Sequence, residues 1–226
     1  MEYDVVMGTL RNMGSRSSVE SMKRFGIDTS TALGISLPEL RRLAKEIGTD
    51  QGLSLRLWDS GIHEAMVLAT IIADRDKTTG KQLERWVKDI NSWDVCDSAC
   101  SMFSWTRFAL DKVGEWSSRR PEYEKRAAFS LIAYIAVHRK ELDDGVFVGF
   151  LPLIIRESAD GRNFVKKAVN WALREIGKRN MRLNKVAIKT AMHLKKSESR
   201  SARWIGSDAY RELAGEAVQA RLRNRR

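Results

Sequence analysis

Apolar residues recur at intervals of three and four along nearly the whole chain, which is the spacing of amphipathic helices. In LPELRRLAKEIG, residues 37–48, the leucines, Ala44 and Ile47 fall on one helical face. Ser36 followed three residues later by Glu39 predicts a capping box at the start of this helix. Gly48 predicts its end, because glycine readily adopts the left-handed conformation found after helices.

Similar start signals recur further along the chain. Thr79 with Gln82 opens KQLERWVKDI, and Pro121 can open EYEKRAAFSLIAYIAVHRK. Either Asp160 or Asn163 can cap FVKKAVNWALREIGK. No stretch alternates with a period of two between turn signals, so we expect no sheet. The pattern predicts an all-α protein of about a dozen helices, each of about 8–18 residues with short connections.

Such a chain forms either a globular bundle or a stack of helix pairs. Three segments that mix alanine with large apolar residues favour stacking: GIHEAMVLATIIA, EKRAAFSLIAYIA and VKKAVNWALREIG. They begin near residues 61, 124 and 165, at separations that match one or two units of a two-helix repeat. Each has the pattern expected of the inner helix of a layer.

Composition indicates one folded domain. The chain has 226 residues, of which 43% are hydrophobic and 31% charged, and only three prolines. No linker composition interrupts it, so we expect a single domain over residues 1–226. No apolar run approaches the length of a membrane span, and the acidic start MEYDVVMGTL is not typical of a signal peptide. We therefore expect a cytoplasmic monomer that is not associated with a membrane.

Positive charge is concentrated toward the end of the chain. The net charge is +11, and residues 162–226 hold 18 Lys/Arg against 5 Asp/Glu, a net of +13. Residues 1–161 are close to neutral by comparison. A basic final third, with a basic tail from about residue 214 to 226, favours a polyanionic partner such as nucleic acid. A solvated basic surface with a frayed tail is the alternative.

Cysteine and histidine give no metal signature. Cys96 and Cys100 lie one helical turn apart, which suits an intrahelical disulfide poorly. The histidines, His63, His138 and His193, are scattered, so no four-ligand zinc site can be assembled from the pattern. We expect reduced thiols that serve packing, and no metal.

The segment SWDVCD combines an indole with a carboxylate. If a helix begins near Ser92, Trp93 and Asp97 are neighbours one turn apart on the same face. Asp94 then lies in the first turn, where the helix dipole favours a carboxylate. Trp93 can be a core residue and Asp97 an ion-pair partner, or the two can form half of a reaction centre.

A second aromatic and basic combination occurs in VNWALREIGKRN. Trp171 precedes Arg174 by one turn, and Lys178 and Arg179 follow. An indole beside cations can hold a sugar-phosphate chain, with the ring against a sugar or base and the cation on a phosphate. An amphipathic helix with Trp171 turned inward explains the same pattern.

Taken together, several segments resemble the DNA alkylation repair glycosylase family, the AlkD-like enzymes. They are ALGISLPELRRLAKEIG, LWDSGIHEAMVLATIIAD, SWDVCD, EKRAAFSLIAYIA and FVKKAVNWALREIGKRN, which occur in the family's order over about residues 20–213. The resemblance implies a right-handed solenoid of HEAT-like helix pairs whose concave basic face holds duplex DNA. It also implies hydrolysis of the N-glycosidic bond of purines alkylated at N3 or N7, without a cofactor.

The resemblance also carries site residues onto this chain. The family's Trp-x-x-x-Asp pair falls on Trp93 and Asp97, its tryptophan before ALRE on Trp171, and its phosphate-binding arginine on Arg126, beside Lys125. Trp93, Asp97 and Trp171 are therefore the predicted catalytic residues. The predicted DNA-binding residues are Arg126, Lys166, Arg174, Lys178 and Arg179. The chain departs from the family at SMKRFGIDTSTALGI, where an aromatic-proline segment is common, so no DNA contact is carried over there.

Two other functions remain open from the sequence. One is a HEAT-like module that binds DNA through the basic final third without catalysis. The other is a helical scaffold for proteins. The presence of Asp97 favours the glycosylase over the first, and the net charge of +13 over residues 162–226 argues against the second.

Overall fold

The fold was derived from a computed structural model that describes residues 1–224. Within this part of the chain there are fourteen α-helices of 8–17 residues and no strand. The all-α class and the absence of a sheet, both predicted from the apolar spacing, are confirmed. None of the helices that the structure describes combines the length and the apolar character needed to cross a membrane.

The helices group into two compact units, which are described separately. Unit 1 comprises Met1–Phe108 and unit 2 comprises Ala109–Arg226. The single domain of residues 1–226 stays a prediction. The helices of unit 1 are α1 (Tyr3–Met13), α2 (Arg16–Arg24), α3 (Leu37–Ile47), α4 (Gln51–Asp59), α5 (His63–Ile72), α6 (Gly80–Asp89) and α7 (Trp93–Phe103). Those of unit 2 are α8 (Ala109–Ser117), α9 (Glu122–His138), α10 (Asp144–Glu157), α11 (Asn163–Gly177), α12 (Met181–Lys195), α13 (Arg200–Leu213) and α14 (Glu216–Arg223).

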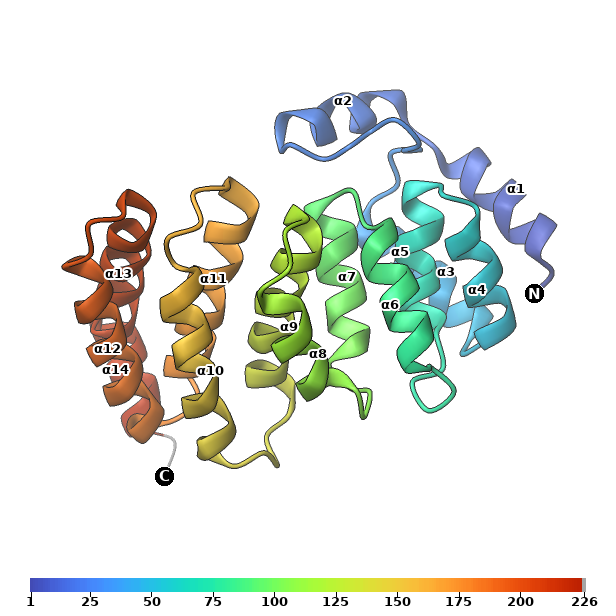
Figure 1. Cartoon of the computed structure of the whole chain (residues 1–226). Helices are drawn as coiled ribbons and strands as arrows, with labels where there is room; N and C mark the ends of the chain where they lie inside the picture. The colour runs from blue at the N-terminus through green and yellow to red at the C-terminus, as the bar shows by residue number, and fades with distance from the viewer. Residues whose placement is uncertain (225–226) are drawn as a thin grey trace. The chain divides into compact units, whose positions relative to one another are not determined.

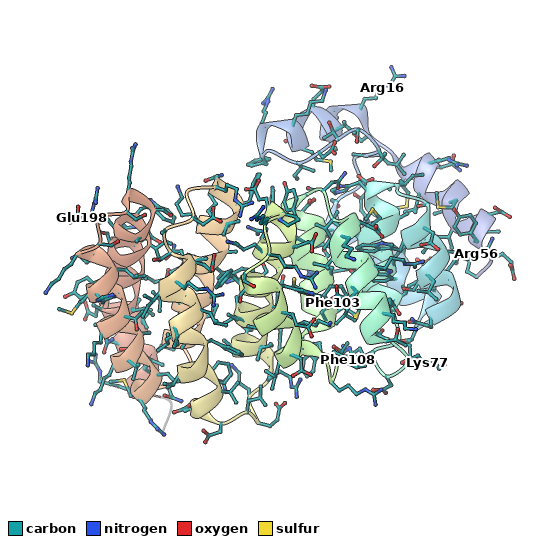
Figure 2. All side chains as sticks on the ribbon, in the orientation of Figure 1. Arg16, Arg56, Lys77, Phe103, Phe108 and Glu198 are labelled. Atoms are coloured by element: carbon teal, nitrogen blue, oxygen red, sulfur yellow. The ribbon has the colours of Figure 1, made fainter. Side chains whose placement is uncertain are left out.

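In unit 1, successive helices pack as layered pairs (Figure 1). Helices α3, α5 and α7 form one row, α4 covers α5, and α6 covers α7. The core between α4 and α6 includes Trp58 and Trp86, whose rings stack with centroids 4.0 Å apart. Helix α2 lies outside these rows, and Arg16 projects from it into solvent (Figure 2). None of its own residues is buried.

Unit 2 repeats the layered arrangement. Helices α9, α11 and α13 form a row, while α8, α10 and α12 form the layer that covers it (Figure 1). Helices α12 and α13 approach closely because Gly206 has no side chain: a Cβ there would lie 2.5 Å from the carbonyl oxygen of Ala191. The segments predicted as inner helices fall on α5, α9 and α11, each of which is mostly buried.

Several predicted helix boundaries are confirmed. Ser36 and Glu39 form the capping box of α3, and Gly48 follows that helix with a left-handed φ of 76°. Thr79 caps α6 by accepting a hydrogen bond from the backbone N–H of Gln82 at 3.1 Å. Each of these contacts joins residues close in sequence, which is why the sequence alone predicts them.

The predicted cap of α11 is wrong. Arg162 occupies the N-cap position, and Asn163 is already the first helical residue. Asp160 instead accepts hydrogen bonds from the Arg162 guanidinium, at 3.0 Å and 2.6 Å, and pairs with Lys125 of α9 at 3.4 Å. The hydrogen bond from Arg162 lowers the pKa of Asp160 to about 2, because it outweighs burial, which alone would raise this pKa. The carboxylate thus holds α11 to α9 rather than capping it.

A buried carboxylate anchors the segment that precedes α3. Glu64 on α5 has no solvent exposure and accepts hydrogen bonds from the backbone N–H groups of Leu33 at 2.8 Å, Gly34 at 2.7 Å and Ile35 at 3.3 Å. Gly34 adopts a φ of 85°, a conformation that favours glycine. The carboxylate therefore satisfies three amide groups of an irregular segment that has no helix of its own.

A second polar contact joins α5 to the start of α7. The ring nitrogen Nε2 of His63 lies 2.9 Å from an Asp94 carboxylate oxygen, and His63 is 4% exposed. The other oxygen of Asp94 accepts hydrogen bonds from the Ser92 hydroxyl at 2.5 Å and the Val95 N–H at 3.0 Å. Asp94 therefore does more than complement the helix dipole, because it fixes the first turn of α7 against α5.

The predicted basic tail is helical over most of its length. Helix α14 (Glu216–Arg223) packs on α13, and Leu222 is buried. The Gln219 side chain donates hydrogen bonds to the Leu213 carbonyl at 2.7 Å and to the Asn184 side chain at 2.9 Å. The alternative of a frayed tail, RLRNRR at residues 221–226, is therefore wrong for residues 221–223, which are helical, whereas residues 225–226 lie outside the described residues.

Replacing Glu64 with glutamine is expected to lower the free energy of unfolding by about 2 kcal/mol, because one acceptor oxygen becomes an N–H₂ donor that faces a backbone N–H. Denaturant unfolding of Glu64→Gln measures the effect. Glu46→Gln removes an exposed carboxylate from α3 and serves as the control. An equal stability of both variants would contradict a holding role for Glu64.

The His63–Asp94 pair predicts a pH dependence of stability. Burial opposes protonation of His63, but the hydrogen bond and charge of Asp94 outweigh it and raise its pKa above 6.5. Burial also opposes ionisation of Asp94, but His63 and Ser92 outweigh it, so the pKa of Asp94 falls below 3.8. The stabilisation by His63 is thus complete below about pH 6.5 and is lost as the pH rises through the raised pKa. The stabilisation by Asp94 is lost only as the pH falls through the lowered pKa of this carboxyl group.

The free energy of unfolding should therefore be higher at about pH 5.5 than at about pH 8.5. The His63→Gln variant should lose most of this difference. His193→Gln, which changes an exposed histidine of α12, should retain it. A wild-type protein equally stable at both pH values would refute the assignment.

Candidate functional site

The SWDVCD segment forms the first turns of α7, as predicted. Ser92 is the N-cap residue and Trp93 is the first helical residue. Trp93 and Asp97 lie one turn apart and are both partly exposed, whereas Cys96 and Cys100 on the same helix are fully buried. The cysteines therefore pack in the core, whereas solvent reaches the Trp93 indole and the carboxylates of Asp94 and Asp97.

The orientation of Trp93 is fixed by a segment that the pattern did not suggest. Its indole N–H donates a hydrogen bond to the backbone carbonyl of Phe25, at the end of α2, at 3.1 Å. The phenyl ring of Phe25 is 68% exposed. Together with the His63–Asp94 contact, this hydrogen bond holds both the backbone and the indole at the start of α7, which restricts the position of Asp97 one turn later.

In unit 2, Arg126 joins α9 to the start of α11. Its side chain is 5% exposed, and its guanidinium donates a hydrogen bond to the backbone carbonyl of Phe164 at 2.8 Å. The neighbouring Lys125 pairs with Glu157 and Asp160 and is therefore engaged with α10 and its following loop. The predicted contact of Arg126 with a DNA phosphate stays a prediction.

Trp171 lies on α11, where it packs against α9. Its ring meets that of Tyr134 edge to face, with centroids 5.1 Å apart, and Tyr134 stacks on His138 at 5.8 Å. The indole N–H donates a hydrogen bond to Glu175 at 3.2 Å. Trp171 is partly exposed, so neither the fully inward tryptophan of an amphipathic helix nor a freely rotating surface tryptophan describes it.

The structure thus brings together Trp93 and Asp97 on one helix of unit 1, and places Arg126 and Trp171 on adjacent helices of unit 2. The catalytic roles of Trp93, Asp97 and Trp171 stay predictions, as does the convergence of the two pairs on one DNA-binding surface. Within residues 1–224, no group of three or more His, Cys, Asp and Glu side chains could hold a metal ion.

The other cations predicted to bind DNA make intramolecular contacts. Arg174 and Lys178 both pair with Glu212 of α13, and Lys178 also pairs with Glu175 at 2.6 Å. Arg179 donates hydrogen bonds to two backbone carbonyls, those of Ala136 at 2.7 Å and Leu142 at 3.3 Å. Burial lowers the pKa of Arg179 below its ordinary value. The role of these three residues in DNA binding stays a prediction, but each also links helices within unit 2.

Lys166 lies beside an aromatic residue that the sequence reasoning missed. Its ammonium nitrogen is 4.8 Å from the ring centroid of Trp204, which is on α13 and is 41% exposed. A cation over an indole face is attracted by the ring quadrupole. Trp204 directly follows Arg203, and this pairing of an indole with a cation was the available signal.

Comparison with known proteins agrees with these features. The family model described as "DNA alkylation repair enzyme" matches residues 6–213, a span that includes helices of both units. A solved structure described as "a new family of proteins related to the HEAT-like repeat DNA glycosylases with affinity for branched DNA structures" matches with a TM-score of 0.83 and 20% identity, covering 98% of this chain and 96% of that chain.

A designed armadillo repeat protein is less similar, with a TM-score of 0.34 and 15% identity over 77% of this chain and 91% of that chain, and adds nothing to the assignment. No curated protein matches. The match at a TM-score of 0.83 confirms the predicted fold of HEAT-like helix pairs, whereas the handedness of the superhelix and its concave basic face stay predictions. The family match confirms the resemblance inferred from the motifs, and the chain belongs to the DNA alkylation repair enzyme family.

Proposed function

We propose that this protein is a DNA glycosylase that hydrolyses the N-glycosidic bond of N3- or N7-alkylated purines in duplex DNA. The observation that carries the proposal is the partly exposed Asp97 carboxylate, one turn from an indole that is itself held in place at 3.1 Å by the backbone carbonyl of Phe25. Membership in the DNA alkylation repair enzyme family supports the same conclusion.

The substrate explains why so few groups suffice. A purine alkylated at N3 or N7 carries a positive charge, so it leaves as a neutral base without protonation by the enzyme. The electron pair of the glycosidic bond departs with the base, and the deoxyribose becomes an oxocarbenium-like cation. The protein must then stabilise that cation and direct a water molecule to it, which is the demand that carboxylates meet in glycoside hydrolysis.

Asp97 supplies the negative charge in this mechanism. A carboxylate held on a fixed helix faces the developing positive charge without having to reorganise, and such preorganised groups contribute about 2.7–4 kcal/mol to transition-state stabilisation. The contacts of Asp94 with His63 and Ser92 fix the first turn of α7, which limits the movement of Asp97. The same carboxylate can orient the attacking water molecule.

The aromatic and basic residues complete the proposed site. In unit 1, Trp93 lies against the deoxyribose beside Asp97, since aromatic faces attract a cation by about 0.5–2 kcal/mol. In unit 2, Trp171 offers an aromatic face to the sugar-phosphate chain. The hydrogen bonds of the two indole N–H groups to Phe25 and Glu175 set the ring planes in advance. Arg126 binds the phosphate next to the lesion, which positions the DNA backbone without reading bases.

A second candidate function is the recognition of branched DNA without catalysis. The observation in its favour is the fold shared with the structure described as having affinity for branched DNA, at a TM-score of 0.83. A DNA-binding protein of this kind needs the basic surface but has no use for Asp97. Release of 7-methylguanine from methylated duplex DNA distinguishes the two functions, because only the glycosylase frees the base.

The Asp97→Asn variant is expected to release 7-methylguanine about 10²–10³-fold more slowly than the wild type, since the charge is removed while the shape is kept. Its affinity for unmodified duplex DNA should remain close to that of the wild type. Single-turnover base release and fluorescence anisotropy measure the two quantities. Asp111→Asn removes an exposed carboxylate from α8 and should leave both unchanged. A wild-type release rate in Asp97→Asn would exclude Asp97 from the mechanism.

The Arg126→Ala variant is expected to bind duplex DNA more weakly and to release the base more slowly, because it loses a cation that positions the backbone. Since Arg126 also bonds to the Phe164 carbonyl at 2.8 Å, the melting temperature is measured alongside, and Arg126→Lys retains the charge. Recovery of duplex affinity in Arg126→Lys is expected. A folded Arg126→Ala protein with wild-type affinity would argue against the phosphate contact.

A further inference from the structure

One side of α12 forms a basic face that the proposed glycosylase site does not use. At 100° per residue, five side chains fall within about 100° of the helix circumference. We call them the α12 basic face: Arg182, Lys185, Lys189, His193 and Lys196. All of them are exposed. Helix α12 contains no aspartate or glutamate, and the face extends over about 21 Å along its axis.

The cations of this face are available for binding. Among residues 1–224, no carboxylate lies within ion-pair distance of Lys185, Lys189 or Lys196, and Arg182 reaches Asp144 only at 3.9 Å. Glu198 lies beyond the helix, in the loop before α13, and projects outward (Figure 2). Arg174 and Lys178 on α11 differ in this respect, because Glu212 pairs with both. Like charges one turn apart destabilise a helix, so this face favours an anionic partner.

The α12 basic face points away from the row that carries Arg126 and Trp171. The buried side of α12, which includes Leu183, Ala187 and Ala191, packs against α11 and α13. The basic face is on the opposite side of the helix. A DNA duplex is stiff over about 150 base pairs, so one straight segment cannot contact both sides of unit 2.

The chemistry of the face favours nucleic acid over other anionic partners. The face presents only cationic and imidazole groups, and Met192, which is 49% exposed, lies at its edge. It therefore lacks the aromatic anchors that dominate protein interfaces and the apolar side chains that a membrane-bound helix inserts. Lysines spaced along one helix suit the phosphates of a duplex, which needs no base-specific contact.

We propose that the α12 basic face binds a second duplex segment, so that the protein contacts two arms of a branched DNA at once. The inference rests on the proposed function, in which a first duplex segment contacts the row of α9, α11 and α13. It does not depend on catalysis, because the α12 basic face makes only phosphate contacts.

The test uses the full chain with Lys185→Gln, Lys189→Gln and Lys196→Gln combined. Its matched control combines Lys45→Gln, Lys81→Gln and Lys88→Gln, three exposed lysines of unit 1. Binding is measured over a range of salt concentrations to a linear duplex and to a four-way junction built from the same arms. The slope of log K against log salt should become less steep by about 0.9 for every phosphate that a variant no longer neutralises.

We call the triple lysine variant of α12 the α12 variant. On the junction, its salt slope is expected to correspond to two or three fewer neutralised phosphates than that of the wild type. On the linear duplex, its salt slope should equal that of the wild type. The control should keep the wild-type slope on both DNAs. An α12 variant with the control's slope on the junction would overturn the proposal. An equal change of slope on the linear duplex would also overturn it, because the face would then be the primary binding surface. Release of 7-methylguanine, measured in parallel, tests the glycosylase separately: the α12 variant should retain it.

Discussion

Each helix of this protein can bury its apolar side only against the helices stacked next to it, and most of the structure follows from that constraint. A helical repeat has no central core shared by all elements, so stability depends on contacts between neighbours. Helix α11 illustrates this, because it packs against α9, α12 and α13 together. Where two helices must come unusually close, as α12 and α13 do, a glycine provides the space at Gly206.

Polar contacts then set the position of one helix relative to the next. Apolar packing alone allows helices to slide, whereas a hydrogen bond or ion pair between named atoms fixes their register. In unit 1, Glu64 holds the segment before α3, and the His63–Asp94 pair holds the start of α7. In unit 2, Arg126 and Arg179 bond to backbone carbonyls on other segments. The candidate catalytic residues lie on helices that are positioned in this way.

Two sets of basic residues in unit 2 differ in whether carboxylates pair with them. Arg174 on α11 and Lys178, which follows this helix, are neutralised within the protein by Glu212. Those on the outer side of α12 are exposed, and within the described chain its lysines face no carboxylate at ion-pair distance. Net charge alone predicts a polyanion partner but cannot say which cations it contacts. The location of the cations that no carboxylate neutralises, rather than the total charge, therefore indicates which surface can contact DNA.

The sequence by itself determined the features that depend on neighbouring residues. The spacing of apolar residues gave the helical class, the capping box at Ser36 and Glu39 gave the start of α3, and the four-residue spacing placed Trp93 and Asp97 on one face of α7. The tertiary structure alone decided which side chains are paired. The partners of Arg174, Arg179 and His63 lie 38, 43 and 31 residues away, respectively, in Glu212, Ala136 and Asp94. Helical periodicity fixes the side of a helix on which a residue lies, but only the packing of another helix decides which groups that side meets.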